Sequence, residues 1–104
     1  MKKFELKSSD STVPNGVRII EYERNRQINE EGWTDNHDNE YKKGELALAA
    51  MCYAAPDKST VLRSWPWDSS WWKPTPDDRI RELAKAGALI AAEIDRLLRE
   101  MYDD

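Results

Sequence analysis

The sequence has little sulfur and little imidazole. Its 104 residues include one cysteine, Cys52, and one histidine, His37. A lone cysteine excludes a disulfide within the chain and a zinc site of several thiolates, and it suits a reducing cytoplasm. No apolar run approaches the ~20 residues of a transmembrane helix, and no apolar stretch follows the opening Met-Lys-Lys as in a signal peptide. We therefore expect a cytoplasmic protein without a membrane partner.

An excess of basic residues is also missing. The formal net charge is −4 at pH 7, whereas a nonspecific nucleic-acid or membrane-surface binder needs a basic face. The charge therefore argues against a nucleic-acid partner. A free nucleotide remains open, because one small anion needs only a local cluster of hydrogen-bond donors.

The predicted fold is mostly α, a compact three-helix domain with a long tryptophan-rich loop. Residues 1–16 are polar and predict a flexible arm that ends in a turn at 14–16, with a weak strand signal at Phe4 and Leu6. Residues 17–104 form the single domain. Its first helix covers about 17–31, because apolar and long side chains recur at helical spacing.

The two later helices are indicated by different signals. Gly32 ends the first helix, and the almost uncharged segment 44–55 predicts a second helix that is buried on most sides. A loop of nearly twenty residues follows, and Thr75-Pro76-Asp77-Asp78 has the capping hydroxyl, proline and acids of a helix start. The third helix then runs to about Met101. Its apolar stripe predicts that Leu83 and Ile94 are buried.

Tryptophans are abundant where regular structure is not expected. Four of the five lie within eight positions, at Trp65, Trp67, Trp71 and Trp72. Interleaved proline, aspartate and serine exclude a regular helix or a central strand there. Such a loop either folds back to fill the core of a small domain or lines a site for a flat ligand, since indole faces stack on planar heterocycles. We expect at least two of the four, and Trp33 also, to be mainly structural.

Other polar residues near these segments suggest chemistry less specifically. His37 beside Asp38 is more typical of a loop hydrogen bond than of a metal or acid–base site, because no second histidine or cysteine accompanies it. Glu30, Glu31, Glu40 and Glu45 could suggest a magnesium site, but their spacing does not repeat at helical intervals. The candidates for phosphate or ribose contacts are Arg24, Gln27, Thr34, His37, Lys43 and Lys73. Arg26 is expected to form surface ion pairs.

A family resemblance rests on several of these motifs. Residues 26–34 (RQINEEGWT), then His37-Asp38-Asn39 and Lys43, resemble the ryanodine-receptor repeat, or RyR domain. The segment 79–90, with Lys85-Ala86, is its loose counterpart in the last helix. The resemblance implies an RyR-like helical fold and adenine-nucleotide binding. Asn39 stands where the repeat has a second aspartate, which weakens any paired-carboxylate site more than it weakens binding.

Over residues 17–97 the chain also resembles a family of small phage and prophage proteins. The shared motifs are GELA at 44–47, WPW at 65–67, WWKP at 71–74 and KAGALI at 85–90. This resemblance, together with RyR-related domains beside bacterial immune modules, implies a sponge: a phage protein in the host cytoplasm that binds a nucleotide-derived immune signal without cleaving it. The predicted ligand is a nucleotide or cyclic nucleotide, with no cofactor, metal or catalytic residue.

The residues expected to bind this ligand combine stacking and polar side chains. They are Arg24, Gln27, Trp33, Thr34, His37, Asp38, Lys43, Trp65, Trp67, Trp71, Trp72 and Lys73. Two alternatives stand: a magnesium-dependent nucleotide pyrophosphohydrolase, and a protein-interaction module whose tryptophans anchor a host protein and inhibit it. Homo-oligomerisation is left open.

Overall fold

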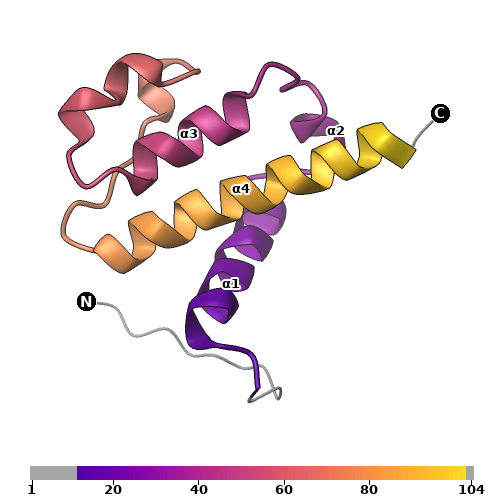
Figure 1. The fold of residues 1–104 in the computed structure, drawn as a ribbon, viewed down its shortest axis with the longest axis horizontal. Helices are drawn as coiled ribbons and strands as arrows, with labels where there is room; N and C mark the ends of the chain where they lie inside the picture. Colours follow the sequence, from indigo (N-terminus) through magenta and orange to yellow (C-terminus); the bar gives the residue numbers. More distant parts are fainter. Residues whose placement is uncertain (1–11, 103–104) are drawn as a thin grey trace.

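The computed structural model describes residues 12–102 and is mostly helical, which confirms the predicted fold class (Figure 1). The helices are α1 (Asn15–Glu30), α2 (Asp35–Asp38), α3 (Glu45–Ala54) and α4 (Arg79–Tyr102). Residues 12–102 contain no strand, and the strand signal at Phe4 and Leu6 lies outside them. In the part of the chain that the structure describes, no helix is long and apolar enough to cross a membrane.

The three long helices match the sequence prediction, but their ends differ from it. The turn expected before 17 is the first turn of α1, whose Val17 and Arg18 amides donate to the Pro14 carbonyl. The short α2 lies in the segment predicted as a polar connection. The last helix starts at Arg79 rather than near Thr75, because the Asp78 carboxylate accepts from the Arg81 amide and so caps it.

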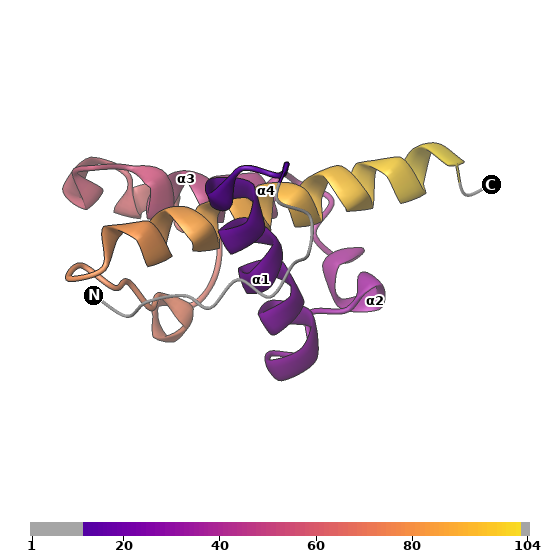
Figure 2. The same cartoon turned by 90° about the horizontal axis from the view of Figure 1, so that it is seen from below.

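Helix α4 is the spine of the domain. Helix α3 lies alongside it in the opposite direction, and α1 crosses it (Figures 1 and 2). Small residues of α4 let both neighbours approach closely. At the α1 crossing, a Cβ built on Gly87 would meet the Ile20 side chain at 2.6 Å. The core between α3 and α4 consists of Leu46, Ala49, Ala50, Tyr53, Ala86, Leu89 and Ala92.

The tryptophan-rich loop folds back on this core in three 3₁₀ turns, Lys58–Thr60, Leu62–Ser64 and Ser69–Trp71. Trp65, Trp67 and Trp72 pack against the core. Trp65 sits at the centre of this cluster, with ring centroids 5.7 Å from Tyr53, 5.4 Å from Trp67 and 4.9 Å from Trp72. The loop therefore supplies part of the hydrophobic core, as the structural interpretation of the tryptophans expects.

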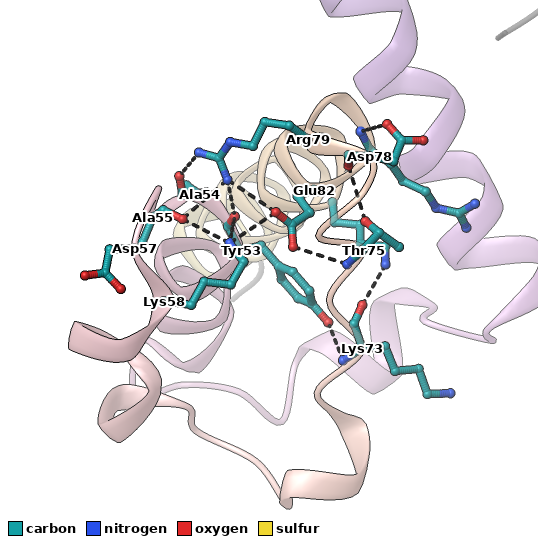
Figure 3. A network of polar contacts seen from close by, with 12 residues as sticks. Tyr53, Ala54, Ala55, Asp57, Lys58, Lys73, Thr75, Asp78, Arg79 and Glu82 are labelled. Carbon is teal, nitrogen blue, oxygen red and sulfur yellow. Dashed lines mark hydrogen bonds and ion pairs between the residues drawn. The ribbon is translucent and has the colours of Figure 1, made fainter. Parts of the chain in front are cut away.

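Polar contacts fasten the loop to α3 and α4 (Figure 3). The Arg79 guanidinium donates to the carbonyls of Tyr53, Ala54 and Ala55, and Lys58 donates to the first and last of these. These carbonyls end α3 and have no partner within the helix. The two cations thus provide hydrogen-bond donors for these carbonyls, and their positive charges interact favourably with the negative end of the α3 dipole.

The outward face of α4 contradicts the sequence prediction. Leu83 is 45% exposed and Ile94 is 52% exposed, although both were expected to be buried. The residues of α4 that are buried instead include Ala84, Lys85, Ala88 and Leu89. Apart from Leu89, the apolar residues of α4 that face the neighbouring helices are mainly small alanines, while the other large aliphatic side chains are exposed.

Candidate functional site

A pocket of about 170 Å³ lies between α1, the turn after it, the tryptophan-rich loop and the first half of α4. Its walls combine aromatic rings with charged side chains. The aromatic residues are Trp33, Tyr53 and Trp71, and Leu89 adds an aliphatic surface. Its volume is below the roughly 300–1,000 Å³ of most ligand sites, so it suits one planar ring system with its attached groups rather than a dinucleotide.

Trp33 is placed at the pocket by the turn that ends α1. Gly32 has a φ of 76°, a left-handed conformation that suits glycine. The reversal allows the Trp33 amide to donate to the Gln27 carbonyl at 3.1 Å. The indole is consequently held beside the last turns of α1. It is partly buried against the core and also lines the pocket.

Trp71 reaches the pocket from the loop and differs from the other loop tryptophans. Its 3₁₀ turn is capped by Asp68, whose carboxylate accepts from the Ser70 amide at 2.8 Å, and the Trp71 amide donates to the Asp68 carbonyl. The residue is 57% exposed. Its indole is therefore held by the backbone of a capped turn while much of its surface remains open for stacking.

The pocket is locally basic in an acidic chain. Four cations, Arg26, Lys73, Arg81 and Lys85, line it, against two carboxylates, Glu23 and Glu31. The carboxylates are both committed to Arg26, which donates to Glu23 at 2.9 and 2.8 Å and to Glu31 at 3.3 Å. The hydrogen bond that Arg26 donates to Glu23 raises the pKa of Arg26.

With Arg26 neutralised, the remaining positive charge belongs to the other three cations. Lys73 extends its side chain away from the network that holds its backbone (Figure 3). Arg81 Nε is buried and has no hydrogen-bond partner among the described residues. These two side chains are the ones best placed to bind an anion.

Lys85 has a different role because it is buried. Its Nζ donates to the Lys73 carbonyl at 2.8 Å and lies 5.5 Å from the centre of the Tyr53 ring. Burial lowers the pKa of Lys85, and the neighbouring charge of Arg81 lowers it further. The Lys73 amide in turn donates to the Tyr53 hydroxyl at 3.2 Å. Lys85 and Tyr53 thus fix the backbone of Lys73 at the rim of the pocket.

Gln27 gives the pocket a buried acceptor. The residue is only 2% exposed, and its Nε2 donates to Glu23 Oε2 at 3.2 Å. A carboxylate accepts only, so this contact fixes which way the amide faces. Gln27 Oε1 is left without a hydrogen-bond partner among residues 12–102. An unpaired buried acceptor costs free energy, and a ligand N–H or O–H donor would remove that cost.

Of the residues predicted from the sequence, Gln27, Trp33, Trp71 and Lys73 meet at this pocket. The other predicted residues lie elsewhere. Trp65, Trp67 and Trp72 pack on the core, and Thr34 and Lys43 are exposed outside the pocket lining.

Arg24, His37 and Asp38 form a separate polar cluster. The buried Asp38 is 3.6 Å from Arg24 Nη1 and 2.9 Å from His37 Nδ1, while Arg24 Nη2 contacts Asp95 at 3.4 Å. The cluster joins α1, α2 and α4, and the His37 ring stacks on Trp33 with centroids 5.9 Å apart. Its arrangement supports the turn that carries Trp33.

Sequence reasoning missed Tyr53, Arg81 and Lys85 as site residues. Arg81 and Lys85 are four positions apart, so they share a face of α4. That face meets the pocket only because α3 brings Tyr53 beside it. Their spacing predicts that the two cations lie side by side on α4. Whether they face a pocket or solvent depends on how α3 packs against α4, which the spacing does not show.

Within residues 12–102, no three histidine, cysteine, aspartate or glutamate side chains come together as a group that could hold a metal ion. Glu30 and Glu31 pair with Arg26, and Glu45 accepts from the Lys43 amide. Three of the four carboxylates considered for the pyrophosphohydrolase alternative, Glu30, Glu31 and Glu45, are thus engaged in separate local contacts.

No protein-family model matches the chain, and comparisons with curated proteins and with solved structures give no match either. The interpretation of the site therefore depends on its own geometry and chemistry.

Proposed function

We propose that the protein binds a purine nucleotide, or a signal derived from one, without cleaving it. The observation that carries the proposal is the pocket in which two indoles, a set of cations and an unpaired buried acceptor converge. Each of these groups suits a different part of a nucleotide.

The base is assigned to the aromatic side of the pocket. Trp33 and Trp71 both line it, and Trp71 has indole surface to offer. Stacking of a base on an aromatic side chain contributes ~1–3 kcal/mol. Gln27 Oε1 suits an exocyclic amine such as that of adenine, because it accepts a hydrogen bond and has no partner among the described residues.

The phosphate is assigned to Lys73 and Arg81. Both line the same pocket as the indoles. Neither is paired with the two carboxylates of the pocket, because Glu23 and Glu31 both accept hydrogen bonds from Arg26. Arginine binds phosphate through several N–H groups at once, and lysine acts as a mobile point charge. A nucleotide is thus favoured over an uncharged nucleoside.

The resemblance to the RyR domain and to small phage proteins supports a biological setting for this activity. A phage protein that holds a nucleotide-derived immune signal would act as a sponge in the host cytoplasm. No reaction step is required of the pocket, since sequestration needs affinity alone.

A thermal-shift series with matched ligands tests the proposal. AMP, GMP and 3′,5′-cyclic AMP are compared with ribose 5-phosphate and inorganic phosphate at equal concentration. Ligand at 100 times its Kd adds about 2.7 kcal/mol to the free energy of unfolding, so at least one purine nucleotide should raise the Tm while the two base-free anions do not. Equal shifts from ribose 5-phosphate, or no shift with any purine nucleotide, would contradict the proposal.

A further inference from the structure

Glu23 is a buried carboxylate that accepts three hydrogen bonds from side chains of its own helix. Arg26 Nε donates to its Oε1 at 2.9 Å, and Arg26 Nη2 donates to its Oε2 at 2.8 Å. Gln27 Nε2 donates to the same Oε2 at 3.2 Å. Because these partners follow Glu23 by three and four positions on α1, the helix itself brings them together.

The carboxylate decides which atom of the Gln27 amide is left for a ligand. If the amide turned over, its Oε1 would face a Glu23 oxygen, so two acceptors would meet and the hydrogen bond from Nε2 would be lost. Both changes are costly for buried groups. Glu23 therefore leaves Gln27 Oε1 as the atom of this amide that has no partner among residues 12–102.

Gln27 is also tied to a stacking ring of the pocket. Its carbonyl accepts from the Trp33 amide at 3.1 Å, and both residues line the pocket. The turn that ends α1 thus holds an indole and an acceptor together. A base that stacks on Trp33 would meet, at its edge, an amide that accepts a hydrogen bond and does not donate one.

We infer that Glu23 is a positioning residue that makes the pocket select bases with an N–H donor on their edge, as adenine and guanine have. The inference rests on the proposed nucleotide binding and adds a chemical requirement for the base. Both oxygens of Glu23 are engaged by Arg26 and Gln27, so Glu23 acts on the ligand through Gln27. A base that offers only acceptors leaves Gln27 Oε1 unpaired, and the free energy of binding is lower by that cost.

Purine riboside 5′-monophosphate tests the requirement for a donor. It is AMP without the 6-amino group, so its base has no N–H donor. In isothermal titration, the wild-type protein should bind it about tenfold more weakly than it binds the tighter of AMP and GMP. Gln27→Met removes the acceptor and should bring the two affinities close together.

The outcomes separate this inference from the proposed function. A wild-type protein that binds purine riboside 5′-monophosphate as tightly as AMP or GMP overturns the inference and leaves nucleotide binding intact. A Gln27→Met protein that keeps the wild-type ratio of affinities also overturns it. No binding of AMP, GMP or the analogue contradicts the proposed function itself, and the inference with it.

Glu23→Gln tests the positioning role. Glutamine has nearly the same shape, but its amide both donates and accepts, so the Gln27 amide can turn over and donate to an acceptor of the base. The ratio of affinities should then narrow to about threefold or less. A merely structural role would weaken both ligands alike and leave the ratio unchanged.

Glu93→Gln is the matched control. Glu93 accepts from Arg96 at 2.7 Å with its side chain 14% exposed, and it lies outside the pocket lining. The substitution weakens a carboxylate–arginine contact of the same kind on α4, so the ratio should stay at the wild-type value. A Glu23→Gln protein that keeps the wild-type ratio, as Glu93→Gln should, overturns the role of Glu23.

Discussion

Individual tryptophans contribute to this protein in two different ways. Trp65 is surrounded by Tyr53, Trp67 and Trp72, whereas Trp71 is 57% exposed and lines the pocket. Amino-acid composition does not distinguish the two residues, because both are tryptophans of the same loop. Only their surroundings distinguish an indole that fills the core from one that remains open for a ligand.

Truncation of these two residues should separate stability from binding. Trp71→Ala should leave the free energy of unfolding of the ligand-free protein within ~0.5 kcal/mol of wild type. Trp65→Ala should lower it by on the order of 3 kcal/mol, because it removes a ring from the aromatic cluster. Urea denaturation of both variants measures the difference. A Trp71→Ala protein as unstable as Trp65→Ala would mean that Trp71 is core and is not held open for a ligand.

Four of the twelve predicted ligand residues lie at the pocket. The other eight lie elsewhere because they pack on the core, bind one another or lie outside the pocket lining. Arg24, His37 and Asp38 were predicted to contact a ligand, but they bind one another across α1 and α2. A sequence shows which side chains can donate and accept. It does not show whether a neighbour already satisfies them, which depends on long-range packing.

At the scale of the elements, the end of α1 depends on one glycine. Gly32→Ala forces a Cβ into a left-handed conformation at a cost of ~1–2 kcal/mol. Relief of that strain would displace Trp33, so we expect both a lower Tm and weaker nucleotide binding. Gly16→Ala is the control: its φ is not positive and nothing lies near its Cβ, so its stability should match wild type or exceed it by up to ~0.5 kcal/mol. A Gly32→Ala protein with the wild-type Tm would contradict this account of the turn.

The crossing of α1 over α4 depends on a matched pair of small and large residues. Gly87→Ala would bring a methyl group within 2.6–3.2 Å of three Ile20 atoms, and such overpacking costs ~1–3 kcal/mol. Ile20→Ala removes the obstructing atoms. In a double-mutant cycle, the Gly87→Ala substitution should therefore cost less in the Ile20→Ala background than in wild type. Additive losses would show that Ile20 does not limit the space at Gly87.

The same elements show how far sequence patterns reach. Periodicity and composition placed the three long helices and identified Gly32 as a stop. They also found the apolar stripe of α4, but its assignment to the core was wrong for Leu83 and Ile94. Helical periodicity shows that one face is apolar, and both a core and an interface produce that pattern. The alanines on the other faces of α4 mark the packed side of the helix instead, since they let α1 and α3 pack closely there.

At the scale of the whole molecule, charge is distributed unevenly. The chain has a formal net charge of −4, yet four cations and two carboxylates line the pocket. Nucleotide affinity should fall by a factor of several between 50 and 500 mM NaCl, because salt screens partly exposed charges. Fluorescence titrations across this range measure the effect. An affinity that rises with salt would indicate that stacking alone holds the ligand and that Lys73 and Arg81 do not contact it.

The central claim is that the pocket beside Trp33 and Trp71 binds a purine nucleotide. Isothermal titration of AMP and 3′,5′-cyclic AMP into the wild-type and Trp71→Ala proteins addresses it most directly. We expect at least one of these ligands to bind at one site per chain, with a loss of ~1–3 kcal/mol in Trp71→Ala, which is roughly a 5- to 160-fold increase in Kd. Equal affinities for the two proteins, or no binding of either nucleotide to the wild-type protein, would contradict the account.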